Sequence, residues 1–351
     1  MESRETHTSE SKETVVCIGS VAKDIFFPTA SGEFFETPED LTSQKKVAFE
    51  VGAKYQIEDR FESLGGVAAN SSVGLSRLGI SVSCAGAVGN DDIGEWIRRE
   101  LSREGVDGTR LTILDDAKSD LSSILVFAQT GERTIFYNRD AAECFEVNDS
   151  VFDGASWVLV SALNGNWKTH LQKILAAREN FGFKLAVNPG QRNLQDDPAL
   201  VLSLAAAADV LLLNKDEAIE LLLPVVPDRS LLEDELFLVK RLFENGARCI
   251  ALTDGARGAW GYDGGEVVHA LPPQILRAID TTGAGDAFGS AFLAASLEGK
   301  TLAQRIRWGL LNGASVVCHF GAIQGLLTRA VLDSREREGE ANLAKISTKI
   351  L

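Results

Sequence analysis

The run of residues 280–289 combines the residue types that transfer of a phosphoryl group needs: Asp-Thr-Thr-Gly-Ala-Gly-Asp-Ala-Phe-Gly. Gly283 and Gly285 flank Ala284, so the backbone there can bend sharply and approach a ligand closely. Asp286 follows at once, and an apolar helical stretch begins behind it. Free backbone N–H groups at a helix start attract anions, and a carboxylate among them would repel an anion unless its task is to take a proton. The run therefore predicts amides that hold a moving phosphoryl group beside a general base, Asp286.

Two other interpretations of this run need weighing. Its glycines could serve only a turn, with Asp286 as the cap of the following helix. A dinucleotide-binding fingerprint, GxGxxG, fails because Phe288 occupies its sixth position and no strand–glycine–helix unit with a downstream ribose carboxylate follows. The turn-and-cap interpretation stays open on these residues alone.

A second glycine pair precedes another predicted helix, in the run Gly65-Gly66-Val67-Ala68-Ala69-Asn70. Paired glycines leave room for a small ligand against the backbone, and Asn70 can both donate to and accept from hydroxyl groups. The same run is equally compatible with tight packing of a helix on a sheet, with Asn70 as a solvated polar residue.

Two further polar motifs follow predicted strands. Glu217, in Asn214-Lys215-Asp216-Glu217, could hold hydrated Mg²⁺, although acids in a first helical turn also favour the helix dipole. The run Thr253-Asp254-Gly255-Ala256-Arg257-Gly258 offers a hydroxyl, glycine amides and a guanidinium that could cradle phosphates. An ordinary turn between a strand and a helix would have a similar composition.

The composition narrows the class of protein. The chain has 351 residues, of which 45% are hydrophobic, and its net charge of −15 disfavours nucleic acid and anionic lipid as partners. No apolar run of about 18 residues predicts a membrane span. Residues 1–13 are polar and lack the features of a signal peptide, so we expect a disordered tail on a cytoplasmic protein. The five cysteines and four histidines show no metal-ligand spacing, which predicts reduced thiols and no structural zinc.

Short apolar segments alternate with helical segments along the chain. The predicted strands are residues 15–18, 82–88, 157–160, 184–187, 210–213 and 249–252. The predicted helices are residues 67–78, 93–104, 167–180 and a segment from Asp216 onward. This alternation predicts an α/β fold, a doubly wound and mainly parallel sheet. The polar motifs all fall at predicted strand ends, where ligands bind in open sheets of this kind.

Two regions interrupt the alternation, at residues 26–61 and 119–137, and neither contains a convincing helix. Residues 121–127 and 134–137 flank Gln129-Thr130-Gly131-Glu132, which predicts a hairpin turn. We expect the two regions to pair as a small β-sheet that serves as a lid, because phosphoryl transfer must exclude water. An edge extension of the main sheet or a dimer contact is the alternative. Residues 332–351 predict a terminal helix or tail.

The order and spacing of these motifs resemble the ribokinase or PfkB family of carbohydrate and nucleoside kinases. Residues 65–70 with Leu78-Gly79 are similar to its amino-terminal signature, and residues 280–288 closely resemble its carboxyl-terminal signature. Intermediate blocks of the family are matched in order by residues 19–24, Val88-Gly89-Asn90-Asp91, Asn188-Pro189-Gly190, residues 214–217 and residues 253–258.

The resemblance implies a ribokinase-like kinase domain over residues 14–331, with Asp286 as the base and the N–H groups of Gly283, Ala284 and Gly285 as an anion hole. It implies further roles for these residues: Asp24, Gly65, Gly66 and Asn70 toward substrate hydroxyls; Asn188, Thr253, Gly255 and Gly258 toward the ATP phosphates; Asn214 and Glu217 toward Mg²⁺ held through water; Asp280 and Thr282 toward a K⁺ ion; and Asn312 toward adenine.

The sequence thus favours an ATP-dependent kinase that acts on a hydroxyl of a small sugar, using Mg²⁺ and with K⁺ as an optional cofactor. A purine nucleoside kinase similar to adenosine kinase is the alternative, and a binding protein without turnover is a third interpretation. Arg139, at the end of a predicted lid strand, could pair with a carboxylate or phosphate of a sugar derivative or simply face solvent. A homodimer formed through the lid is one option for assembly.

Overall fold

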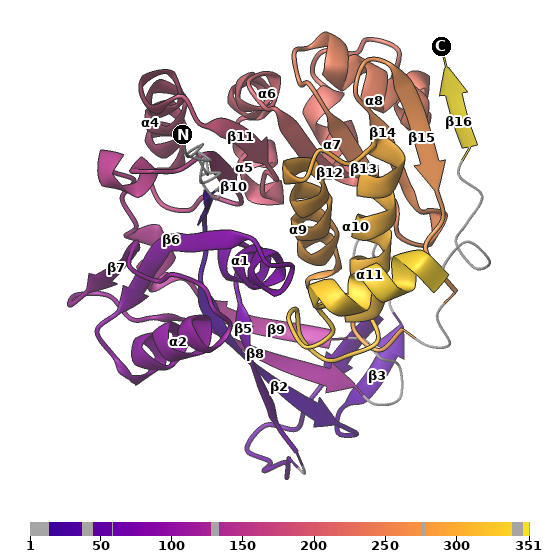
Figure 1. Cartoon of the computed structure of the whole chain (residues 1–351). Coiled ribbons are helices and arrows are strands. Elements are labelled where there is room, and N and C mark those ends of the chain that lie inside the picture. The colour runs from indigo at the N-terminus through magenta and orange to yellow at the C-terminus, as the bar shows by residue number, and fades with distance from the viewer. Residues whose placement is uncertain are drawn as a thin grey trace, which may run out of the picture.

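The computed structural model of the chain describes residues 14–36, 45–57, 59–127, 133–274, 278–338 and 347–350. Two of the predictions above, the tail at residues 1–13 and the turn at residues 129–132, lie outside the described residues. The described part consists of one large sheet covered by helices on both faces, with a smaller sheet beside it (Figure 1).

The large sheet has the strand order β16-β15-β14-β13-β12-β11-β10-β1-β6-β7. Its strands are β1 (Thr14–Ile18), β6 (Ser81–Gly89), β7 (Leu111–Leu114), β10 (Trp157–Val160), β11 (Lys184–Val187), β12 (Val210–Asn214), β13 (Ile250–Thr253), β14 (Ala259–Tyr262), β15 (Glu266–Ala270) and β16 (Ser347–Ile350). Neighbouring strands are parallel along the sheet order from β7 through β6, β1, β10, β11 and β12 to β13. Strands β14, β15 and β16 continue the sheet in antiparallel pairs. The predicted doubly wound, mainly parallel sheet is confirmed.

Helices cover both faces of this sheet, which is why its central strands are apolar throughout (Figure 1). One face carries α1 (Val67–Arg77), α2 (Asp92–Arg103), α9 (Ala284–Leu297), α10 (Leu302–Val316) and α11 (Arg329–Glu338). The other carries α3 (Asp140–Glu143), α4 (Trp167–Phe181), α5 (Gln191–Asp196), α6 (Pro198–Ala206), α7 (Lys215–Leu222) and α8 (Glu235–Glu244). Because side chains alternate along a strand, Val15 and Cys17 of β1 enter the first core, and Val16 and Ile18 enter the second.

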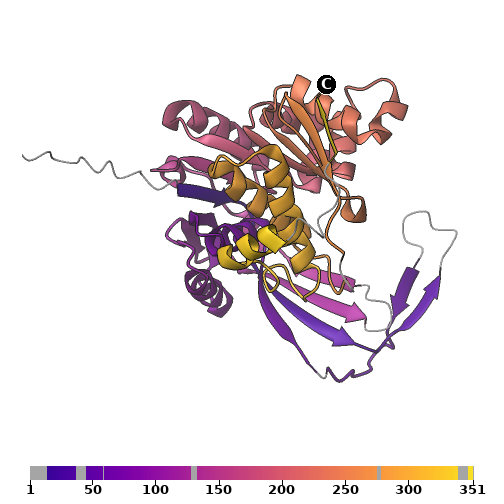
Figure 2. The same cartoon turned by 45° about the vertical axis from the view of Figure 1, so that its right-hand side comes forward.

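The smaller sheet has the order β5-β2-β8-β9 and is called the lid sheet below. Its strands are β2 (Ala22–Thr29), β5 (Phe61–Gly65), β8 (Asp120–Phe127) and β9 (Arg133–Asn138), and a hairpin of β3 (Glu33–Glu36) and β4 (Lys45–Ala48) follows β2. It projects from one end of the molecule in Figure 2. The prediction that the two irregular regions pair as a small sheet is confirmed, although β2 begins before the first region and β5 runs past its end.

The carboxyl-terminal segment differs from the expected helix or tail. Helix α11 begins at Arg329, and residues 347–350 form a strand that pairs antiparallel with β15. A four-residue strand gains its stability from the edge it covers, which local sequence does not reveal. In the part of the chain that the structure describes, no helix combines the length and apolar character that a bilayer span requires.

Candidate active site

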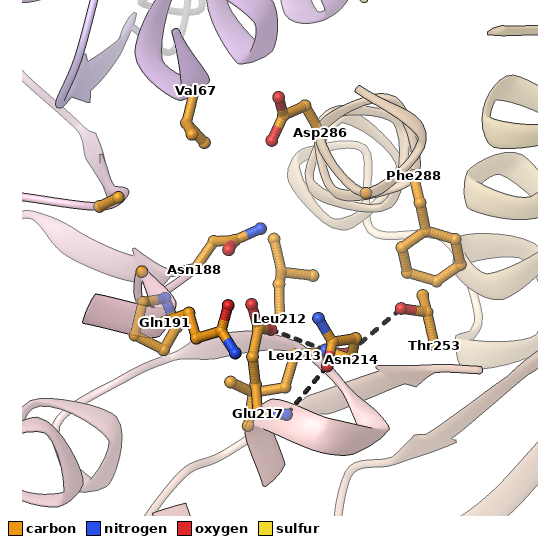
Figure 3. A pocket seen from close by; sticks show the side chains of 14 residues that line it. Val67, Asn188, Gln191, Leu212, Leu213, Asn214, Glu217, Thr253, Asp286 and Phe288 are labelled. Atoms are coloured by element: carbon orange, nitrogen blue, oxygen red, sulfur yellow. Dashed lines mark hydrogen bonds between the residues drawn. The ribbon is translucent and has the colours of Figure 1, made fainter. Parts of the chain in front are cut away.

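A cavity of about 310 Å³ lies at the carboxyl ends of strands β10 to β13, beside the point where chain order reverses between β1 and β10. This is the position at which open α/β sheets bind ligands. The cavity is lined by Val67, Ala162, Asn188, Pro189, Gly190, Gln191, Leu212, Leu213, Asn214, Glu217, Thr253, Gly285, Asp286 and Phe288. Figure 3 shows Asp286 on the side of helix α9 and Glu217 on the side of the sheet.

Asp286 lies in the first turn of α9 and lines this cavity. Burial raises the pKa of its carboxyl group to about 6, and the hydrogen bond from Asn70 opposes that rise. The Nδ2 of Asn70 donates to Oδ2 of Asp286 at 2.8 Å, which joins α1 to α9. A carboxyl group with a pKa near 6 is ionised at neutral pH and is still basic enough to accept a proton.

The start of α9 is open to the cavity. Gly283 adopts a left-handed conformation (φ 75°), and a Cβ there would collide with Ala322. Within the described residues, no side chain caps this helix and no heavy atom lies within 4 Å of a Cβ built on Gly285. The first amides of a helix have no acceptor inside the helix, so those of α9 can bind an anion, although the Ala284 N–H donates to the Thr281 carbonyl at 3.3 Å. The predicted residues Gly283, Ala284 and Gly285 therefore lie beside Asp286.

Glu217 both caps helix α7 and lines the cavity. Asn214 and Glu217 form a reciprocal capping box at the start of α7, in which Oε2 of Glu217 accepts from the Asn214 backbone N–H at 2.8 Å. The same carboxylate lines the cavity. Burial, and then the negative charge of Asp286, raise the pKa of Glu217 to about 7. The capping interaction uses one oxygen and leaves the other for a ligand.

The charge of the cavity limits which ligands it can bind. Among the lining residues that the structure describes, Asp286 and Glu217 are the two charged ones, and both are acids. Asn188 follows β11 and Thr253 ends β13, so both predicted nucleotide contacts lie in the cavity. A polyphosphate would be repelled from two acids unless a cation entered with it. Mg²⁺ fits this donor set, since it binds through one or two carboxylates and keeps several waters.

The residues expected to bind the acceptor lie where the lid sheet meets α1. Asp24 of β2 is 7% exposed, and burial raises the pKa of its carboxyl group although the Ser122 hydroxyl and Arg139 oppose the rise. A Cβ on Gly65 would collide with the Asp24 carboxylate, so this glycine makes the approach of β5 possible. Gly66 (φ 87°) then turns the chain into α1, which carries Asn70.

Ser122 of β8 is a residue that the sequence analysis missed. Its hydroxyl bonds to the Asp24 carboxylate and lies 3.3 Å from Nη2 of Arg139, which also packs over the ring of Tyr137 at 4.8 Å. Asp24 and Ser122 are paired across β2 and β8, so they share a face of the lid sheet. Alternation along β8 could have placed Ser122 on one face, but the pairing with β2 could not be read from the sequence.

Three predicted nucleotide contacts lie outside the lining of the cavity. Gly255 is in a 3₁₀ turn after Thr253, and Gly258 packs so closely on Ala270 that a Cβ would collide with it. Asn312 requires a correction, because it is fully buried in α10: its Nδ2 donates to the Ala287 carbonyl and its Oδ1 accepts from the Leu327 N–H, both at 2.8 Å. Asn312 thus connects helices instead of facing a ligand.

The two residues expected to bind K⁺ bond to each other, and the Asp280 carboxylate has further protein partners. Oδ1 of Asp280 accepts from the Thr282 N–H at 2.9 Å, from the Thr282 hydroxyl at 2.7 Å and from Nη1 of Arg133 at 2.9 Å. Oδ2 accepts from the Gly321 N–H at 3.0 Å. Arg133, the first residue of β9, was not among the residues predicted from the sequence.

Comparison with known proteins adds to this geometry. A model of the pfkB family of carbohydrate kinases matches residues 14–329. A ribokinase from Haemophilus influenzae is 28% identical over 326 residues, which cover 91% of this chain and 96% of the relative. A 5-dehydro-2-deoxygluconokinase from Bacillus subtilis is 25% identical over 278 residues, which cover 76% of this chain and 84% of the relative.

Solved structures show the same fold. The nucleoside kinase of Methanocaldococcus jannaschii superimposes with a TM-score of 0.72 at 22% identity, covering 93% of this chain and 98% of that one. A ribokinase from Cryptococcus neoformans in complex with ADP gives 0.71 at 22% identity, covering 92% and 99%. At these levels of identity, the solved structures show the fold alone. The family is shown by the family model, which matches nearly the whole sequence. The chain therefore belongs to the pfkB family of carbohydrate kinases and is a phosphotransferase.

Proposed function

We propose that this protein transfers the γ-phosphoryl group of ATP to a hydroxyl of a small sugar, with Asp286 as the general base. The observation that carries the proposal is the position of Asp286 in the cavity, at the uncapped start of α9, with a pKa raised to about 6. A base with this pKa is mostly ionised at pH 7 and can accept the proton of an attacking hydroxyl.

The acceptor hydroxyl is oriented by Asn70 and Asp286 together. Asn70 is 5% exposed, its Nδ2 is bound to Asp286, and its Oδ1 has no hydrogen-bond partner among the described residues. A buried amide oxygen without a partner costs free energy, which a donated hydroxyl hydrogen would recover. Asp24, next to Gly65 and Gly66, accepts from a second hydroxyl of the sugar, and Arg139 borders the same face of the lid sheet.

The transfer itself relies on positioning and charge. Asp286 removes the hydroxyl proton, and the backbone amides of Gly283, Ala284 and Gly285 stabilise the charge that develops on the transferred group. Glu217 and Asn214 would hold hydrated Mg²⁺, with Asn188, Thr253, Gly255 and Gly258 on the phosphate side. Bound Mg²⁺ supplies positive charge that offsets the phosphates and the two acids of the cavity.

A purine nucleoside kinase is the second candidate. The likeness to a nucleoside kinase of known structure favours it, whereas the curated relatives named ribokinase and 5-dehydro-2-deoxygluconokinase favour a sugar. We put the sugar first because the acceptor side, at Asp24 and Asn70, is lined by small polar groups suited to hydroxyls.

The test is a coupled assay of ADP release over a panel of sugars and nucleosides. Asp286→Asn is expected to lower kcat by about 10²–10⁴-fold, because it removes the base, while ATP binding is retained. Asp92→Asn is the matched control, since Asp92 also lies in the first turn of a helix but is exposed on α2. Near-normal turnover of Asp286→Asn, or no acceptor-dependent ADP release from the wild type, would contradict the proposal.

A further inference from the structure

An ion pair joins the lid sheet to the loop that leads into α9. Nη1 of Arg133, at the start of β9, lies 2.9 Å from Oδ1 of Asp280, three residues before Gly283. The side chain of Asp280 is 4% exposed and that of Arg133 is 34% exposed, so the carboxylate is buried and the guanidinium covers it. Arg133 also donates to the Thr281 hydroxyl at 3.3 Å.

The partners of Asp280 do not suit a K⁺ ion. A K⁺ ligand must offer oxygen lone pairs, yet the carboxylate already accepts four hydrogen bonds: from Arg133, from the amide and the hydroxyl of Thr282, and from the Gly321 amide. The guanidinium also matches the single negative charge of Asp280. Because an arginine side chain stays protonated at any working pH, this positive charge is permanent.

We infer that Arg133 is a built-in cation that takes the place of a free monovalent ion at Asp280. Arg133 is a positioning residue: it fixes Asp280, which in turn accepts from Thr282 and holds the turn at Gly283. The amides at the start of α9 are thereby set for catalysis without K⁺. This inference rests on the proposed function for its catalytic consequence.

Removal of the guanidinium would also affect a second carboxylate, that of Asp24. Asp24 lies near enough for the charge of Asp280 to contribute to its raised pKa. Without Arg133, the charge of Asp280 would lack its counterion and would act on the buried Asp24 carboxyl group. Removal of one partner from a buried pair is costly because the remaining charge stays desolvated. The loop should then move, or recruit a cation from solution.

Activity in different salts tests the inference once an acceptor is known. In KCl, NaCl and choline chloride at equal ionic strength, we expect wild-type rates to agree within about twofold, since no free ion is needed. Arg133→Met should lower kcat in choline chloride by about tenfold or more, because a displacement of about 1 Å can cost about 100-fold. KM for the acceptor should change little, and K⁺ or guanidinium should restore part of the rate.

Arg60→Met is the matched control, since Arg60 precedes β5 of the same sheet and pairs only loosely with Glu62, at 3.5 Å. Its rates should equal those of the wild type in each salt. Activation of the wild type by K⁺ that choline does not give, or an Arg133→Met enzyme with normal turnover, would overturn the inference while leaving the kinase proposal intact.

Thermal unfolding tests whether Arg133 replaces a free cation, even if no acceptor is found. The wild type should melt at the same temperature in KCl and in choline chloride. Arg133→Met should melt lower in choline chloride and regain stability in KCl or guanidinium at low millimolar concentration. A stabilisation of the wild type that K⁺ causes and choline does not would show a free-ion site at Asp280 and contradict the inference.

Discussion

The two acids of the cavity set its energetics at the scale of single residues. Burial raises the pKa of Asp286 to about 6 and that of Glu217 to about 7, and the charge of Asp286 adds to the second rise. A carboxyl group with a raised pKa in the folded state stabilises the fold fully below its unfolded pKa, and this contribution is lost as pH rises through the folded value. The two carboxylates therefore lower the stability of the fold when they are ionised, and we expect the protein to keep them because the reaction needs them.

The first prediction concerns the stability of the free protein. Asp286→Asn should raise the free energy of unfolding by about 1–3 kcal/mol at pH 8, because the buried charge is gone. The gain should shrink as pH falls from 6 toward 4, where the wild-type carboxyl group becomes neutral as well. Urea denaturation of both proteins at pH 5 and pH 8 measures it. An equal difference at the two pH values would show that the charge of Asp286 is not the cause.

At the scale of elements, helices differ in whether a side chain accepts a hydrogen bond from the N–H groups of their first turn. Asp91, Asn214 and Thr301 cap α2, α7 and α10 with their side chains. Within the residues that the structure describes, α9 begins on Gly283 with no such cap and opens on the cavity. This helix start lacks the stability that a side-chain cap would add, and its first turn lies within reach of a ligand in the cavity.

The second prediction compares two glycines at this helix start. Gly285→Val should fold with nearly unchanged melting temperature, since a Cβ there meets no described atom within 4 Å, but turnover should fall about 100-fold because the side chain enters the anion site. Gly283→Ala should instead destabilise the fold by about 1–2 kcal/mol or more, because of its left-handed backbone and the collision with Ala322. Melting curves and ADP-release rates separate the two. Normal turnover of Gly285→Val would exclude the anion hole from this place.

Local pattern predicted most elements but few of the contacts between them. Strands β10 and β11 occupy the predicted residues because their apolar runs end at polar breaks. The capping box of Asn214 and Glu217 lies at a helix start that the acids of the first turn had indicated, although the box itself was not predicted. The bonds of Asn70 to Asp286 and of Arg133 to Asp280 join residues far apart in the chain, so they depend on how the lid sheet and α1 meet α9. The buried bridge formed by Asn312 was unpredictable for the same reason.

At the scale of the whole molecule, the lid sheet joins the body through a small apolar core and through polar contacts. A small core of Phe26, Ile124 and Val126 packs on Phe320, whose ring also stacks on Phe61 with centroids 5.5 Å apart. The ion pair of Arg133 and Asp280 is one polar contact, and Oδ1 of Asp120 in β8 accepts from two backbone N–H groups of α3. The main cores are far larger, so we expect the lid sheet to be the part that opens and closes as a unit.

The third prediction follows from that difference. An acceptor sugar together with a non-hydrolysable ATP analogue should slow amide hydrogen exchange in β8 and β9, because binding at Asp24 and Asn70 holds the lid sheet down. Strands β10 to β12 should exchange slowly with or without ligand, since they lie in the centre of the large sheet. Exchange followed by mass spectrometry measures both. Protection confined to the large sheet would show that the small sheet does not close on substrate.

The four residues of β16 cover the edge of the large sheet that β15 would otherwise expose. They run along β15 and place Ile350 opposite Glu266. If a fused tag pulled this segment away, or a shortened chain lacked it, the N–H and C=O groups of β15 would be exposed as a template for a neighbouring molecule. For production of the protein, an affinity tag therefore belongs at the amino-terminal end, and trimming the last residues invites edge-to-edge aggregation.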